Sequence, residues 1–285
     1  MGTKVARSGL PFQGIVLLQI DRRRVAKTEG DEEQVWKLTD SLDAAPYCGP
    51  LIAPDALLMA WNLDPWLLAA LACAGGAALW HRSGSGRTSL QDPALIVAAT
   101  GLFLAFVSPL CAATVALFSA RALHHLVLVS LIAPALAIAL PWRVMPAALA
   151  MGLTGAVLVA WHVPGIYDAA WTSTLVYWLM QAALLLPAWM FWSVVLRPGQ
   201  PAEGLFAHAL GVGGLAAVMG FIGAVLTFAP TGLYAQHLVG TEAYGLTLLA
   251  DQQLAGLIMW VPGFVPLAAI AFWMVQRGWK QGFAA

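Results

Sequence analysis

The chain has 285 residues, of which 60% are hydrophobic and 10% are charged, and it carries no formal net charge. Soluble domains are typically about 45–50% apolar and about 25% charged. This composition excludes a water-soluble globule, a nucleic-acid-binding protein and a disordered chain, and it indicates a membrane protein. The three cysteines form no CxxC pair and no even set, so the sequence predicts neither a disulfide scaffold nor a zinc ribbon.

Charged residues are concentrated at the beginning of the chain. Residues 1–60 hold 7 of the 14 Lys and Arg residues and 8 of the 14 Asp and Glu residues, and no apolar run there is long enough to span a bilayer. We expect residues 1–58 to form a charged, disordered tail, with a docking tail as the alternative and Met59 as an alternative start. Residues 59–285 are then the membrane domain.

Apolar runs of about 20 residues follow this tail, and each could cross a bilayer as a helix. They predict an all-α, polytopic membrane protein with a seven-helix transmembrane bundle. Even spacing and short loops favour a single bundle. The last run is interrupted by Pro262 and Pro266, so we expect its helix to tilt or kink. The predicted spans are residues 65–81, 93–110, 116–140, 145–163, 173–197, 204–228 and 247–276.

Basic residues in the predicted loops all lie on one side of the membrane. The opposite loops, residues 111–115, 164–172 and 229–246, contain no Lys or Arg. Because short cytoplasmic loops are enriched in Lys and Arg, we predict that the basic side faces the cytoplasm, which puts the C-terminus inside and the N-terminus outside. The basic residues are Arg82, Arg87, Arg143, Arg197, Arg277 and Lys280.

Polar side chains of the membrane domain gather at the predicted outer ends of the spans. Polar groups in a bilayer are costly, so their convergence on one face points to a functional site that opens to the outside. His208 is the exception, near the inner end of its span. The candidates are Arg121, His124, His125, His162, Tyr167, Asp168, Tyr234, His237, Glu242, Asp251, Gln252 and Gln253.

Helical spacing orders the residues of the third span. Arg121 and His125 are four residues apart and share a helix face, whereas His124 points about 100° away from His125. We expect one histidine to face the site and the other to pack against a neighbouring helix. Arg121 could pair with Asp251 across the bundle, as either a structural or a functional ion pair.

Histidines from three separate segments share one predicted depth. Imidazole is a suitable ligand for copper and iron, so this set could hold a metal or haem. The alternative is that each histidine is a hydrogen-bonded structural residue. No phosphate-binding GxxxxGK[ST] motif, no GxSxG motif and no HExxH motif is present in the sequence.

Four sequence blocks carry a family resemblance. They are LFSARALHHLVLVSLIAPALAIALP (117–141), AWHVPGIYDAAW (160–171), MGFIGAVLTFAPTGLYAQH (219–237) and DQQLAGLIMWVPG (251–263). Together they resemble the CtaG family of bacterial cytochrome c oxidase assembly proteins, over roughly residues 61–280. The resemblance implies a multi-pass protein of the bacterial plasma membrane and a non-enzymatic accessory role in haem–copper oxidase assembly. It also implies oxidase subunits as partners, and copper delivery or metal-centre assembly at the outer face.

Individual residues match the family's motifs to different degrees. His162 matches the family's Trp-His-x-Pro block, and His237 with Tyr234 matches its outer loop. His125 matches the second histidine of a His-Met-x-x-His pattern, but Arg121 stands at the first position. The hypothesis that follows is a Cu(I) site of three histidines with five supporting residues. The ligands are His125, His162 and His237; the supporting residues are Arg121, His124, Tyr234, Asp251 and Gln252.

Two other functions compete with assembly. A copper or proton transporter should carry polar residues on to the inner face, where Glu203 and His208 are the candidates. A haem-binding electron carrier needs two histidines on facing helices, for which His125 and His162 could serve.

Overall fold

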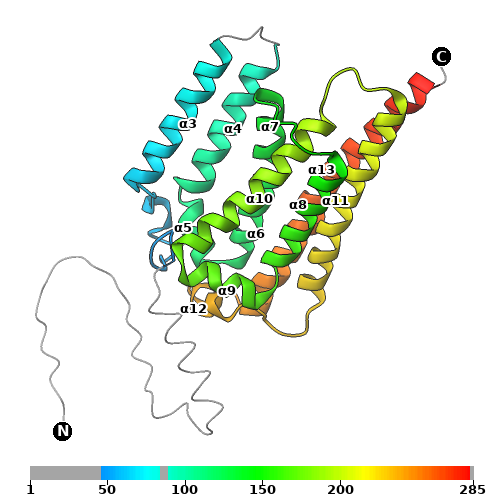
Figure 1. The fold of residues 1–285 in the computed structure, drawn as a ribbon. Helices are drawn as coiled ribbons and strands as arrows, with labels where there is room; N and C mark the ends of the chain where they lie inside the picture. Colours follow the sequence, from blue (N-terminus) through cyan, green and yellow to red (C-terminus); the bar gives the residue numbers. More distant parts are fainter. Residues whose placement is uncertain (1–45, 84–88, 283–285) are drawn as a thin grey trace, which may run out of the picture. The chain divides into compact units, whose positions relative to one another are not determined.

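The structure is a computed structural model that describes residues 46–83 and 89–282. The described residues form helices and no strand, in agreement with the all-α prediction (Figure 1). Residues 1–45 of the expected tail lie outside the described residues. The main helices are α3 (Pro65–Ser83), α4 (Gln91–Phe106), α5 (Leu110–Ala116), α6 (Phe118–Val127), α7 (Ala133–Ala139), α8 (Ala147–Trp161), α9 (Pro164–Thr172), α10 (Thr174–Val195), α11 (Ala202–Phe228), α12 (Leu238–Ala243) and α13 (Leu248–Gly282).

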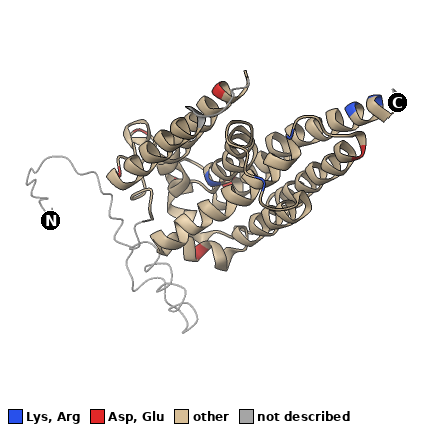
Figure 2. Ribbon diagram, turned by 45° about the horizontal axis from the view of Figure 1, so that its top comes forward, with Lys and Arg blue, Asp and Glu red and all other residues tan. Residues whose placement is uncertain are grey.

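Every predicted span coincides with a helix or a chain of helices. Four helical stretches of the described chain are long and apolar enough to cross a membrane, and the number rises to six if the bent pairs α4–α5 and α8–α9 each count as one span. The remaining predicted span, residues 65–81, corresponds to α3, whose apolar stretch, Pro65–His81, is shorter. Charged residues are sparse along these helices (Figure 2). Seven spans, and the orientation of the termini, remain predictions.

The seventh and the third predicted spans have local features that the sequence did not indicate. α13 continues as one helix through Pro262 and Pro266, so these prolines do not end the helix. The third span is interrupted by a π-helical turn, η2 (Leu128–Ile132), between α6 and α7. A π-turn leaves backbone carbonyls available to other donors, and the indole Nε1 of Trp192 donates to the carbonyl of Val129 at 2.9 Å.

Small residues bring α11 and α13 close together. A Cβ added to Gly223 would lie 2.8 Å from the carbonyl oxygen of Gly256 and 3.1 Å from the backbone nitrogen of Trp260. Backbone atoms cannot move aside as a side chain can, so this position requires glycine. Gly223 is therefore a helix-contact residue, as small residues at helix interfaces in membranes often are.

Residues 46–64, the strap, run along one end of the bundle before α3 begins. Cys48 forms a disulfide with Cys111 of α5, and the ring of Tyr47 stacks on Tyr177 of α10 with centroids 4.9 Å apart. The hydroxyl of Tyr47 donates to Asp64 at 2.7 Å, and this bond lowers the pKa of the Asp64 carboxyl. The disulfide corrects the prediction from cysteine spacing, which considers sequence neighbours, because its two residues are 63 positions apart.

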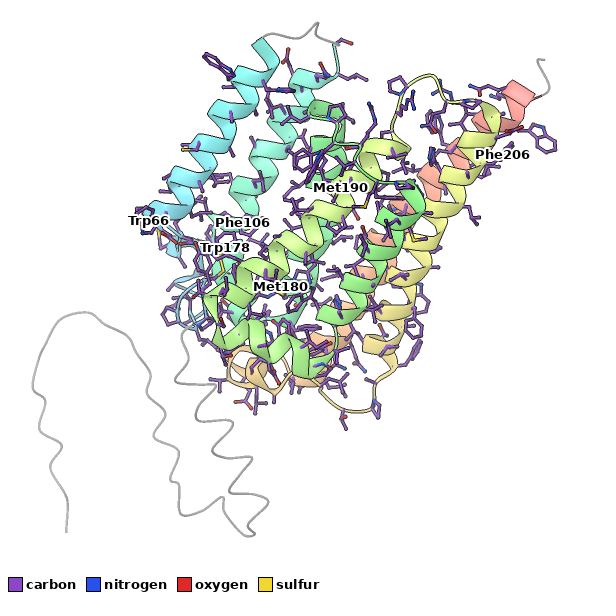
Figure 3. All side chains as sticks on the ribbon, viewed as in Figure 1. Trp66, Phe106, Trp178, Met180, Met190 and Phe206 are labelled. Atoms are coloured by element: carbon purple, nitrogen blue, oxygen red, sulfur yellow. A yellow bond between two sulfur atoms is a disulfide. The ribbon has the colours of Figure 1, made fainter. Side chains whose placement is uncertain are left out.

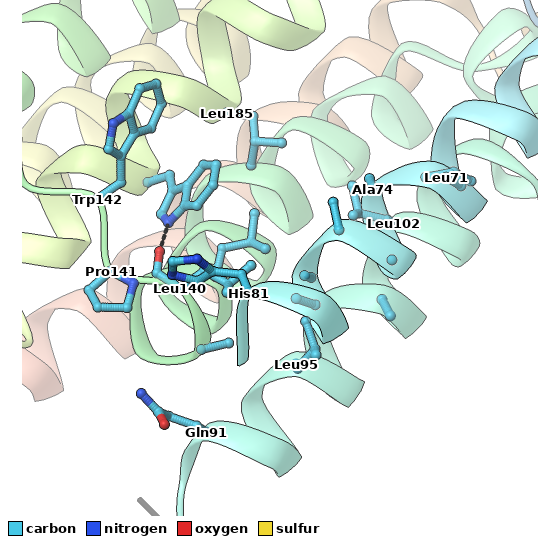
Figure 4. Close-up of a pocket in the computed structure, with 18 of the residues that line it drawn as sticks. Leu71, Ala74, His81, Gln91, Leu95, Leu102, Leu140, Pro141, Trp142 and Leu185 are labelled. Atoms are coloured by element: carbon cyan, nitrogen blue, oxygen red, sulfur yellow. Dashed lines mark hydrogen bonds between the residues drawn. The ribbon is translucent and has the colours of Figure 1, made fainter. Parts of the chain in front are cut away.

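A large apolar cavity lies between α3 and the helices α4, α7 and α10. Leu67 and Ala78 are the buried residues of α3 between Pro65 and His81, and the gap toward α4, α7 and α10 has a volume of about 1010 Å³ (Figure 4). Its polar lining is confined to one end, where His81 and Gln91 face the α7–α8 connection. This end lies at the C-terminus of α3, away from the disulfide.

Glycine-to-alanine substitutions at two positions of α11 should have opposite effects. We expect Gly223→Ala to destabilise the protein by about 1–3 kcal/mol, because the new methyl overlaps the α13 backbone. Nothing lies within 4 Å of a Cβ at Gly213. Gly213→Ala should therefore stabilise by about 0.5–1 kcal/mol through helix propensity. Thermal unfolding of the purified variants in detergent measures both, and equal shifts would contradict the close approach.

Candidate functional site

The N-terminus of α6 is buried inside the bundle and held by a carboxylate from α13. Asp251 accepts hydrogen bonds from the backbone nitrogens of Phe118 (2.6 Å) and Ser119 (3.2 Å), and also from the Ser119 hydroxyl. The first N–H groups of a helix have no partner within the helix, and its N-terminus favours negative charge. Asp251 therefore acts on α6 as a cap from another helix.

The expected ion pair between Arg121 and Asp251 is not formed. Within the described residues, Arg121 Nη2 donates to the carbonyl of Thr114 at 3.3 Å, while Nε and Nη1 have no hydrogen-bond partner. The guanidinium carbon lies 5.9 Å from the ring centre of Tyr167 and 5.6 Å from that of Tyr177. Arg121 thus contacts aromatic faces, because the helix end already occupies the carboxylate.

His125 and His162 form a pair of neighbouring imidazoles. Their ring centres are 5.8 Å apart, and His125 is 2% exposed with no hydrogen-bond partner on either nitrogen within the described residues. His162 follows the last residue of α8, and its Nδ1 lies 2.6 Å from the Leu158 carbonyl. A hydrogen bond from Nδ1 to this carbonyl fixes the tautomer in which Nε2 carries the free lone pair.

His124 points to the other side of α6, as the helical spacing predicts. Its ring meets Phe106 of α4 edge-on with centroids 5.2 Å apart. Phe106 in turn lies beside Trp178 of α10, and Figure 3 shows these two aromatic side chains near the strap. His124 is therefore a packing residue between α6 and α4.

His237 belongs to a separate aromatic group. The hydroxyl of Tyr167 and Nε2 of His237 are 2.9 Å apart and hydrogen-bonded, and Phe118 is a ring neighbour of both His237 and His162. Burial, with a smaller contribution from the Arg121 charge, lowers the pKa of His237 to about 3. His237 is therefore neutral at physiological pH.

Tyr234 and Gln252 fix the connection between α11 and α13 to this end of the bundle. Tyr234 stacks on Phe118 with centroids 3.7 Å apart and donates to the carbonyl of His162 at 2.7 Å. The Gln252 side-chain oxygen accepts from the backbone nitrogen of Leu233 at 2.6 Å. Both supporting residues thus hold backbone in place.

The described residues contain no group of three or more His, Cys, Asp and Glu side chains placed to hold a metal ion. The side chains bring His125 and His162 together, whereas His237 is hydrogen-bonded to Tyr167. A three-histidine copper site therefore stays a prediction. His125 and His162 are the two proposed ligands that lie next to each other in the structure. Two further candidates are exposed: Asp168, which accepts from Gln236 at 3.0 Å, and Glu242.

Three residues of the site were not among the candidates. Ser119 donates to Asp251, Tyr177 lies against Arg121, and Gln181 is buried with neither amide atom hydrogen-bonded within the described residues. Tyr177 and Gln181 are four residues apart on α10 and share a face, which is the signal that could have identified them.

Loss of the Asp251 carboxylate should destabilise the bundle strongly. We expect Asp251→Ala to cost about 3 kcal/mol or more, because buried N–H groups of Phe118 and Ser119 lose their acceptor. Asp251→Asn keeps one acceptor oxygen and should lose less. Thermal unfolding in detergent gives the order, with the exposed Glu203→Ala as a neutral control. An unchanged melting temperature for Asp251→Ala would show that the cap contributes nothing.

Comparison with known proteins identifies the second half of the chain. Residues 146–281 match the family model described as cytochrome c oxidase caa3 assembly factor (Caa3_CtaG). No curated protein matches the chain, and no solved structure does. Three of the four resembling blocks lie in the matched region, together with His162, His237 and Asp251, while Arg121 and His125 precede it. Residues 146–281 of this chain are therefore similar to the Caa3_CtaG family of cytochrome c oxidase assembly factors.

Proposed function

We propose that this chain assists the assembly of a haem–copper cytochrome c oxidase in the bacterial plasma membrane by handling copper at the outer face. The similarity to this family supports the assembly role, with oxidase subunits as partners and no catalytic step of its own. The observation that carries the copper role is the pair of neighbouring imidazoles formed by the buried His125 and the half-buried His162. Copper is cargo in this proposal, received at the pair and passed to the oxidase.

The pair has the donor chemistry that copper requires. Metal ions bind neutral imidazole through a free lone pair, and a second ring nitrogen bonded to a backbone carbonyl orients the ligand. His162 has this bond to Leu158, and His125 is free of competing hydrogen bonds within the described residues. His237 is the candidate third ligand. Copper bound at Nδ1 of His237 would leave the hydrogen bond between Nε2 and Tyr167 intact, whereas copper bound at Nε2 would replace that hydrogen bond.

The disulfide supports an outward-facing site. Cys111 begins a short path of contacts to the site: its carbonyl accepts from Thr114 at 2.7 Å, and the Thr114 carbonyl accepts from Arg121. Disulfides persist in oxidising compartments and are rare in the cytoplasm. The end of the bundle that contains Cys48–Cys111 is also the end predicted to be outside from the distribution of Lys and Arg.

Purified protein from copper-supplemented cells should retain copper. We expect the His125→Ala/His162→Ala double variant to lose it, because both lone pairs are removed, whereas His208→Ala should keep it. His208 lies at the other end of the bundle beside Gln200 and serves as the matched control. Elemental analysis measures the copper content of each variant. Loss of copper in His237→Ala would indicate three histidine ligands, and retention of copper would indicate two.

The same variants test the assembly role. Oxidase activity should be lost on deletion of the gene and restored by the wild type and by His208→Ala, but not by the double variant. Unchanged copper content in the double variant would remove the copper proposal. A Soret band in the purified wild type would indicate a haem carrier instead, and copper flux into vesicles would indicate a transporter.

Labelling of single cysteines tests the orientation. In a Cys73→Ser background, a membrane-impermeant maleimide should label Glu242→Cys in intact spheroplasts, and Glu203→Cys only after lysis. Both glutamates are exposed, and α11 separates them. The opposite labelling pattern would place the disulfide and the histidines on the cytoplasmic side.

A further inference from the structure

Arg121 is a buried cation without a counter-charge. Its side chain is 3% exposed, and among the described residues it forms no ion pair with an Asp or Glu. Its hydrogen bond to the Thr114 carbonyl is long at 3.3 Å, and its other close contacts are with the neutral side chains of Tyr167 and Tyr177. Burying an unpaired charge is strongly unfavourable, so the folded protein gains from any anion that reaches the guanidinium.

The carboxylates at this end of the bundle are engaged elsewhere. Asp251 is fully buried and accepts from Phe118 and Ser119 at the start of α6. Asp168 is exposed and accepts from Gln236. Asp64 accepts from Tyr47, and Asp55 and Glu242 are exposed. None of these carboxylates pairs with Arg121 within the described residues, which leaves an anion from solution as the source of the compensating charge.

The groups around Arg121 are neutral and include an available donor. The hydroxyl of Tyr177 lies 3.5 Å from Sγ of Cys48, and this sulfur can only accept because it is in the disulfide. Sulfur is a weak acceptor, so this O–H can turn to a stronger one at little cost. Arg121 has donors only, and together the two side chains form a donor-rich, buried environment.

We infer that Arg121 and Tyr177 bind a small monovalent anion, of the size of chloride or formate, at the end of the bundle beneath the strap. The guanidinium supplies the charge, and the Tyr177 hydroxyl supplies a second donor. Tyr47 stacks on Tyr177 and Cys48 lies against its hydroxyl, so the strap closes this end over the site. Neither residue is a proposed copper ligand, so the anion site can be tested in the absence of copper.

Thermal unfolding under anion exchange tests this site. The full-length protein is purified in sodium gluconate, whose anion is too large to enter, with a copper chelator present throughout. Chloride or formate then replaces gluconate at constant ionic strength. The wild-type melting temperature should rise with the concentration of the small anion, as expected for a ligand that binds only the folded state. A response to formate as well as chloride identifies a site that accepts carboxylates, and a response to chloride alone identifies a halide site.

Two variants make the result specific. Arg121→Met should not respond to either anion, and in gluconate it should melt above the wild type because the buried charge is gone. Tyr177→Phe should still respond, with an apparent affinity about ten-fold weaker, which is the loss of one hydrogen bond to a charged group. The exposed Arg277→Met is the matched control and should behave as the wild type does.

Three outcomes would overturn the inference. The wild type would show no response to chloride or formate, or Arg121→Met would respond as strongly as the wild type, or Arg277→Met would lose the response. If Arg121→Met does not fold, Tyr177→Phe decides alone, and an unchanged affinity in that variant counts against the site. Because copper is absent, none of these outcomes depends on the histidine pair.

Discussion

The capping of α6 by Asp251 is the constraint on which the candidate site depends. The chain breaks between α5 and α6, and the new helix starts inside the bundle, where water cannot satisfy its first N–H groups. A buried carboxylate on α13 provides the acceptors. This contact fixes where α6 begins, and therefore where its residues at 121, 124 and 125 point. It also consumes the negative charge that would otherwise have paired with Arg121.

The helices were predictable because the signal for them is local. A bilayer requires about 20 apolar residues in succession, and the runs that satisfy this length coincide with the observed helices. Two structural features were not predicted from the sequence, because the local patterns that would indicate them are weaker. Residues 164–172 were taken as an outer loop, yet they form α9, which bends 80° away from α8. Residues 46–58 of the strap fall within the predicted tail, and their contacts with Cys111 and Tyr177 join residues that are distant in sequence, which no local pattern indicates.

The sequence indicated at which end of the bundle the polar residues lie, but it did not indicate which of these side chains contact each other. Polar residues were expected to converge at one end, and those of α6, α8, α13 and the α11–α13 connection do so. Which groups bind each other could not be deduced, since a carboxylate can choose between a guanidinium and a helix N-terminus only in three dimensions. The same limit applies to the histidines. His125 and His162 meet, whereas His237 is engaged by Tyr167, and no spacing in the sequence distinguishes these cases.

The position of Arg121 links the two proposed ligands. Arg121 and His125 lie one turn apart on the same face of α6, so a copper ion on His125 would be close to the guanidinium. Like charges repel strongly where water is excluded, and this repulsion weakens copper binding for as long as Arg121 is uncompensated. An anion beside Arg121 removes that repulsion. By thermodynamic linkage, copper at the histidines must then favour the anion by the same factor, so the two ligands would enter and leave the site together.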